Sequence, residues 1–203
     1  MITPEQSLER TIQALCSELH WGLRFFFAAK SLDQTELKLT QTLFETFSFS
    51  CLDDACLILS RMLISKEKAK KDDSVNVQYL FRQAENNPSL FRFAKAGEIE
   101  SLVPIHRAFL ESHKPIIDIL KNQRDRNLAH LDRKHINQPD WQEHQPGLNW
   151  LEVESLFQDM IDIMNSYCKL FYGKEFDFGD WEAISQGEVK NLIEYFEAFN
   201  STA

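Results

Sequence analysis

The sequence predicts an all-α protein, an antiparallel bundle of about five to six helices forming a single domain over residues 1–203. Glycine and proline number only six each, whereas an all-β chain of this size needs a turn signal every ~8–12 residues. Apolar residues instead recur at helical spacing over long stretches. Hydrophobic residues make up 43% of the chain and include 16 Phe, which is enough to bury a substantial core.

The first two helices are predicted over about 4–29 and 35–64. Thr3 can cap the first, with Pro4 at its first position and Gln6 completing a capping box. Its apolar residues are Leu8, Ile12, Leu15, Leu19 and Leu23. Asp33 with Glu36 gives a second capping signal, and no Gly or Pro interrupts the apolar pattern that follows. The charged segment 66–73 is expected to be an exposed loop.

The middle of the chain predicts a short helix over about 75–85 and then a long one. The short helix ends at Asn86-Asn87-Pro88. The long helix begins between Glu98 and Pro104 and runs to about Leu131, and its apolar side is expected to carry Ile105, Phe109, Ile116 and Leu120. Pro115 lies well inside it, so a kink or break is expected near His113.

The C-terminal third predicts a loop followed by two more helices. Residues 136–148 are rich in polar residues and turn formers. Asn149 is expected to cap an amphipathic helix that ends at Gly173. Residues 174–181 form an acidic, aromatic segment, best interpreted as a packed turn. Ser185 to Glu188 could cap a last helix reaching Phe199.

Composition limits the classes of function. The net charge of -9 argues against a broad cationic surface for nucleic acid, although a local basic patch remains compatible with it. The four cysteines, at positions 16, 51, 56 and 168, form no CxxC pair and are expected to be buried thiols. No cationic-apolar leader opens the sequence, and charges interrupt every apolar run before ~18 residues. We therefore expect a cytoplasmic protein without a membrane span.

One stretch carries residue types suited to phosphate chemistry. Between Lys114 and His135 there are six Lys or Arg and three Asp, a net charge of +3. Arginine presents a planar fork to phosphate oxygens, and histidine can move a proton near neutral pH. Arg126 and His130 are four apart and share a helix face. Arg124 and His130 are six apart, roughly 120° around a helix, so they converge only through long side chains, a distorted turn or a partner subunit.

Taken alone, this pattern favours a solvated helix end whose Arg–Asp pairs contribute little to stability. The other histidines are expected to be structural or to lie in loops: His106 and His113 would share a face without a third metal ligand, and His135 is expected in a loop. His20 and Trp21 are expected in the core or at an interface. Asp53 and Asp54 could face the motif or pair with a buried arginine, and we assign them no chemistry.

The run from Arg124 to Asp132, Arg-Asp-Arg-Asn-Leu-Ala-His-Leu-Asp, resembles the signature of HEPN domains: an arginine, usually a polar residue next, and a histidine after four to six intervening positions. Its form Arg-Asp-x-x-x-Ala-His-x-Asp is similar to the abortive-infection AbiU-like branch. The segments 18–21, 53–61 and 151–173 agree with that likeness. The resemblance implies an all-α bundle that dimerises and brings two copies of the motif together.

Many HEPN proteins are metal-independent endoribonucleases of toxin–antitoxin, phage-defence or RNA-processing systems. The resemblance therefore implies an endoribonuclease that is a toxin or a phage-defence (abortive-infection) protein and that needs no cofactor or metal. Carried over by position, the catalytic residues would be Arg124, Asp125 and His130, with Arg126 as an alternative to Arg124. The expected RNA-binding residues are Arg126, Asn127, Arg133 and Lys134. RNA, a second copy of the chain and an antitoxin protein are the expected partners. The main alternative is a non-catalytic HEPN module that binds a partner protein or a nucleotide.

Overall fold

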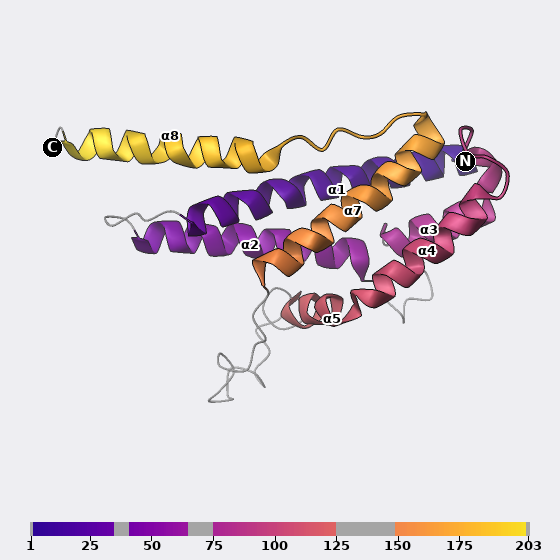
Figure 1. Ribbon diagram of the computed structural model, residues 1–203, viewed down its shortest axis with the longest axis horizontal. Helices are drawn as coiled ribbons and strands as arrows, with labels where there is room; N and C mark the ends of the chain where they lie inside the picture. Colours follow the sequence, from indigo (N-terminus) through magenta and orange to yellow (C-terminus); the bar gives the residue numbers. More distant parts are fainter. Residues whose placement is uncertain (1, 35–40, 65–74, 125–148, 202–203) are drawn as a thin grey trace.

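A computed structural model describes residues 2–34, 41–64, 75–124 and 149–201, and it confirms the all-α prediction (Figure 1). These residues contain no strand and form seven α-helices and a short 3₁₀ helix, η1 (Pro88–Leu90). The α-helices are α1 (Pro4–Asp33), α2 (Gln41–Leu63), α3 (Val77–Asn86), α4 (Glu98–Ser112), α5 (Lys114–Gln123), α7 (Trp150–Tyr172) and α8 (Trp181–Ser201).

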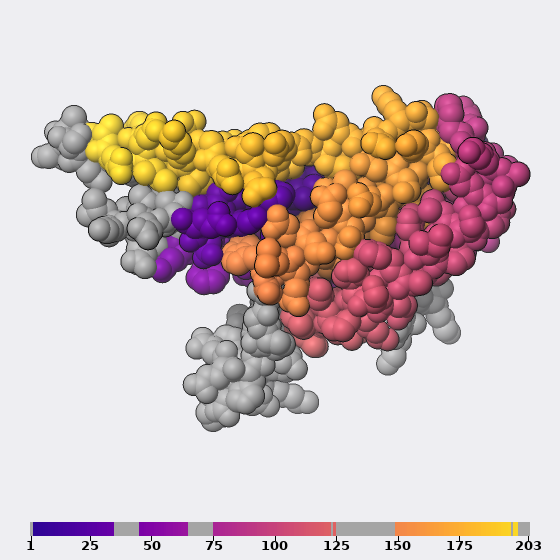
Figure 2. All heavy atoms as spheres, in the orientation of Figure 1, coloured from indigo at the N-terminus to yellow at the C-terminus, as the bar shows by residue number. Residues whose placement is uncertain are grey.

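The fold is built around α1. Helix α2 returns antiparallel along α1, and α7 crosses the pair obliquely (Figure 1). The side chains of α7 cover the middle of α1 on the face seen in Figure 2, and α8 lies along one side. Helix α8 runs in the same direction as α1, so the bundle is not antiparallel throughout, and the two ends of the chain lie far apart.

Helix α1 forms as its capping box predicts. The Thr3 hydroxyl accepts from the backbone N–H of Gln6 at 3.2 Å, and the Gln6 side chain accepts from the backbone N–H of Thr3 at 3.1 Å. The helix extends beyond the predicted end at Ala29, up to Asp33. The prediction that Asp33 caps the second helix is therefore wrong, because Asp33 is itself helical, and residues 35–40 lie outside the described part of the chain. The predicted loop at 66–73 lies outside it too.

The predicted break near His113 is confirmed. Helix α4 ends at Ser112 and α5 begins at Lys114, with Pro115 in the first turn of α5, where a missing N–H costs least. The expected position of Ile105 on the apolar side is wrong, since 62% of this residue is exposed. Ile99, Val103 and Leu110 are buried instead. Ile105 is two residues beyond Val103, roughly 200° around the helix, and so faces outward.

Helix α7 has the predicted ends. The Asn149 side chain accepts from the backbone N–H of Leu151 at 3.0 Å, and Gly173 closes the helix with a φ of 75°. Helix α8 begins earlier than predicted: the Asp180 carboxylate accepts from the backbone N–H of Ala183 at 3.1 Å, so the helix starts at Trp181. The expected cap at Ser185 to Glu188 is wrong, because Ser185 is a buried residue inside this helix.

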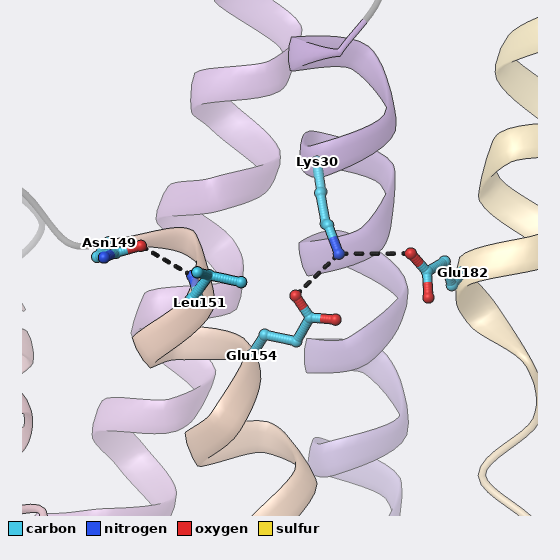
Figure 3. Close-up of polar contacts among 5 residues, drawn as sticks. All are labelled: Lys30, Asn149, Leu151, Glu154 and Glu182. Carbon is cyan, nitrogen blue, oxygen red and sulfur yellow. Dashed lines mark hydrogen bonds and ion pairs between the residues drawn. The ribbon is translucent and has the colours of Figure 1, made fainter.

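Two contacts fix the helices against α1. Gly22 lets α7 approach closely, since a Cβ there would lie 2.8 Å from Cε1 of the Phe157 ring and 3.0 Å from Cγ2 of Ile58. Near the other end of α1, the Lys30 ammonium lies 2.8 Å from Glu154 of α7 and 3.4 Å from Glu182 of α8 (Figure 3). Its hydrogen bond to Glu154 raises the pKa of Lys30. One side chain of α1 thus joins three helices.

Candidate functional site

The last turn of α5 is held firmly against α2. Leu120 is fully buried, and the Ser60 hydroxyl of α2 lies 2.8 Å from the Cys56 carbonyl and 3.4 Å from the Leu120 carbonyl. The backbone N–H of Arg124 donates to the carbonyls of Leu120 and Lys121, and its φ of -56° and ψ of -50° continue the helical geometry. Packing against α2 therefore sets where the backbone of Arg124 lies.

Arg124 lines a pocket of about 590 Å³ together with residues of α1 and α2, Ile64 just after α2 and Val75 just before α3. The other lining residues are Ala14, Leu15, Ser17, Glu18, Arg61, Met62, Ile64 and Val75. In the pocket wall, the Arg61 guanidinium lies 2.7 Å from the Glu18 carboxylate. The lining thus contains two arginines and one carboxylate. Guanidinium groups bind phosphate oxygens in a planar, bidentate geometry, so the pocket suits a phosphate group.

The structure places only one of the predicted site residues. Arg124 is half-buried at the pocket. The others, Asp125, Arg126, Asn127, His130, Arg133 and Lys134, lie outside the described residues, so their roles stay predictions.

Two further residues of the pocket received no role in the sequence analysis. Glu18 and Arg61 belong to the segments that carry the family likeness, yet 43 positions separate them. No local pattern pairs residues at such a distance, and only the packing of α1 on α2 brings them together. Asp53 and Asp54, on the same helix as Arg61, are exposed and do not line this pocket.

The two histidines of the α4 segment occupy structural positions. His113 Nε2 lies 3.2 Å from the Asp159 carboxylate, which ties the α4–α5 break to α7. Burial raises the pKa of Asp159, and Asp162 acts in the same direction, while His113 and Ser155 oppose them. His106 packs against the rings of Phe81 and Tyr167, and burial lowers its pKa.

The cysteines are buried free thiols, as predicted. The sulfur atoms of Cys16 and Cys168 lie 3.5 Å apart between α1 and α7. Within the described ranges, no group of three or more His, Cys, Asp or Glu side chains could hold a metal ion. A helix long and apolar enough to cross a membrane is likewise absent from that part of the chain.

Comparison with known families identifies the family to which the chain belongs. The family model HEPN_AbiU2, described as AbiU2, matches residues 5–192. The matched region contains α1 except for Pro4, the helices α2 to α5 and α7, the first half of α8 and the whole run from Arg124 to Asp132. No curated protein and no solved structure matches the chain.

Proposed function

Because the chain belongs to the AbiU2 family of HEPN domains, we propose that it is a metal-independent endoribonuclease of a toxin–antitoxin or phage-defence system. Arg124 and His130 are its catalytic pair, and the active unit is a homodimer in which two copies of the motif meet. Asp125 orients one of the two catalytic side chains. Arg126, Asn127, Arg133 and Lys134 contact the RNA.

The observation that carries this proposal is the position of Arg124. The arginine of the family-like motif lines a pocket that also holds Arg61, and burial of Leu120 fixes the helix turn that bears it. An arginine whose backbone is fixed before the substrate arrives needs less reorganisation to bring its guanidinium to developing negative charge, which favours stabilisation of that charge. The ion pair with Glu18 holds the second guanidinium near the same pocket.

The proposed reaction is an internal transfer at phosphorus. The ribose 2′-oxygen forms a bond to the adjacent phosphorus while the bond from phosphorus to the 5′-oxygen breaks. His130 of one motif accepts the proton of the 2′-hydroxyl, and the histidine of the second motif supplies a proton to the leaving 5′-oxygen. Arg124 stabilises the charge that grows on the phosphoryl oxygens. The products are a cyclic phosphate and a 5′-hydroxyl end, and no water or metal takes part in this step.

RNA cleavage by the purified protein in the presence of a chelator tests the proposal. We expect wild type to cut RNA and to leave cyclic phosphate ends, and His130→Ala to lose at least a hundredfold in rate, as removal of a general acid–base group does. His113→Gln is the matched control. This histidine is tied to Asp159 at the α4–α5 break, so the variant should cut at close to the wild-type rate as long as it remains folded.

The choice between the two arginines has its own comparison. Arg124→Ala should lower the cleavage rate about a hundredfold or more, the scale of losing one group that stabilises transition-state charge. Arg126→Ala should chiefly weaken RNA binding. The reverse pattern would assign the catalytic role to Arg126.

Mixed dimers test whether the site is shared. A dimer of one wild-type and one His130→Ala copy keeps only one of the two histidines that the proposed reaction uses. An excess of the His130→Ala protein should therefore inhibit cleavage by wild type through subunit exchange, whereas independent sites would leave one working site in each mixed dimer. A folded dimer that cuts none of several RNA substrates would contradict the nuclease proposal and favour a HEPN module that only binds a partner or nucleotide.

A further inference from the structure

The outward face of α1 carries an unusual set of side chains. Arg10, Ala14, Ser17, Trp21 and Arg24 follow one another at intervals of four and three residues, so they lie along one side of the helix. We call these five residues the outer stripe. All except Ala14 are exposed, and 46% of Trp21 is accessible. Core packing does not explain this set, in which the large exposed indole of Trp21 is followed by Arg24 and preceded on the same side by Arg10.

The aromatic part of the outer stripe is ordered by its neighbours. The Trp21 ring lies 6.1 Å from that of Phe25, with an interplanar angle of 30°. The Arg24 guanidinium lies 5.3 Å from the centroid of Trp21 and 5.6 Å from that of Trp181, the first residue of α8. Stacking on both indoles orients Arg24 and leaves its N–H donors, which project from the edges of the guanidinium plane, available to a ligand.

The outer stripe continues directly into the pocket at Arg124. Ala14 and Ser17 belong to both, and Glu18 and Arg61 lie beside them. The charged residues of this combined surface are Arg10, Arg24, Arg61, Arg124 and Glu18, a local charge of +3 in a chain of net charge -9. Its one carboxylate is engaged by Arg61. Charge of this sign selects an anionic ligand.

The surface is also elongated. From Arg10 to Arg24 the helix rises ~21 Å at 1.5 Å per residue, which is long enough for several nucleotides of an extended strand. Proteins recognise single-stranded RNA by stacking bases on aromatic rings and arginine planes while cations follow the phosphates. An apolar partner helix would require a continuous apolar groove, whereas the outer stripe offers one indole among small and cationic side chains.

We propose that the outer stripe is a subsite for single-stranded RNA, in which a base stacks on Trp21 and phosphates contact Arg10 and Arg24. The strand runs along α1 and passes the pocket at Arg124, which Ala14 and Ser17 line between the two arginines. The inference rests on the proposed function for the nature of the substrate, and it adds a binding site next to the pocket at Arg124. It predicts that affinity depends on α1, whereas the cleavage chemistry depends on the motif.

The test measures binding separately from cleavage. All proteins carry His130→Ala so that the RNA stays intact, and the probe is a fluorescent, unstructured oligoribonucleotide followed by anisotropy. Trp21→Ala should raise Kd roughly tenfold, or about 1.4 kcal/mol, the scale of one lost base stack. Trp21→Phe should bind nearly as well as the parent, and Trp21→Leu as poorly as Trp21→Ala. Phe49→Ala, at a residue of α2 that is 67% exposed, is the matched control and should leave Kd unchanged.

The contribution of Arg24 is measured separately, by the salt dependence of RNA binding. Arg24→Gln should weaken binding and lower the slope of log Kd against log salt concentration by about 0.7, as loss of one contact with a single-stranded phosphate does. Lys190→Gln on α8 makes the same charge change at a side chain that is 76% exposed and outside the stripe, and it should leave the slope unchanged. Circular dichroism of each variant checks that the fold is retained.

Three results would overturn the subsite: no RNA binding by the parent protein, a Kd for Trp21→Ala within twofold of the parent, or full binding by Trp21→Leu. Unchanged RNA binding accompanied by dissociation of a dimer would assign the stripe to a protein interface instead. The two proposals fail independently. If wild type cuts no RNA but binding shows the expected pattern, the nuclease proposal falls and the subsite stands. If wild type cuts RNA and the Kd does not depend on Trp21, only the subsite proposal is wrong.

Discussion

The two sides of α1 differ sharply in the side chains they carry, although both belong to one continuous helix. The inner side carries Leu8, Ile12, Leu15, Leu19, Leu23 and Phe26, each at most 3% exposed. The outer stripe carries arginines, small residues and Trp21. Packing determines the inner side chains, because a change of volume there must be accommodated by close-packed neighbours. The outer side is free of that constraint, so its composition can be set by what it binds. With the proposed subsite, stability and recognition would occupy opposite sides of the same helix.

The largest effect on stability is expected from Phe26→Ala. Phe26 is fully buried, with ring centroids 5.3 Å from Phe157 and 5.5 Å from Trp150. Its truncation leaves a cavity and should lower the free energy of unfolding by about 3–5 kcal/mol, measured by urea denaturation. Phe25→Ala, one residue away and only partly buried, should cost clearly less. Equal losses at both positions would contradict the division of α1 into two sides.

A second effect comes from a thiol on the inner side of α2. Burial, with a smaller contribution from Asp53, raises the pKa of Cys56 from 9.0 to about 12. Above pH 9 the unfolded chain therefore loses this proton before the folded one does, so stability falls as pH rises toward 12. At pH 10.5 the difference between the two pKa values of Cys56 lowers the free energy of unfolding by about 2 kcal/mol.

Urea denaturation at pH 8.5 and pH 10.5 measures this loss. Cys56→Ala should lose less stability between the two values than wild type does, by about that amount. Identical pH dependence in both proteins would mean that the Cys56 thiol ionises as easily in the folded chain as in the unfolded one.

A smaller loss of stability is expected from removing the charge of Lys30, near the C-terminal end of α1. Lys30→Met keeps the apolar stem but removes the ammonium between Glu154 and Glu182, whose carboxylates then repel each other. We expect a loss of about 1 kcal/mol that shrinks at high salt, as for a partly exposed ion pair. Lys190→Met, at an exposed pair with Glu194 at 3.8 Å, is the control and should change stability by less.

The smallest effect is expected on the outer stripe itself. Arg10→Ala should change the free energy of unfolding by no more than about 0.5 kcal/mol, as for surface substitutions remote from packed groups. The same variant should nevertheless weaken RNA binding. A large loss of stability with unchanged binding would reverse the assignment of this face.

Sequence reasoning succeeded where local chemistry decides the structure. The capping box at Thr3, the cap at Asn149, the closing Gly173 and the break before Pro115 each depend on groups within a few residues. The motif at Arg124 led to the family, which the family model confirmed independently.

Sequence reasoning failed where contacts between residues far apart in the chain determine the structure. Two capping signals compete at the start of α8, and Asp180 prevails over Ser185 as Trp181 docks edge-on to His20, with ring centroids 4.8 Å apart. The pairing of Glu18 with Arg61 likewise depends on how α1 packs against α2. The exposed Ile105 is a different kind of error, because it lies roughly 200° around α4 from the buried Val103 and was grouped with the wrong apolar residues.

Gly22 makes the same point in terms of sequence variation. Every other amino acid adds a Cβ, and at this position the added atom would meet the core ring of Phe157 at 2.8 Å. A saturation mutagenesis screen should therefore find position 22 about as intolerant as position 26, although one bears no side chain and the other a phenyl ring. The pattern of tolerated mutations would then mark the crossing of α1 and α7 at two kinds of position. At position 22 no side chain fits, and at position 26 a large side chain is required.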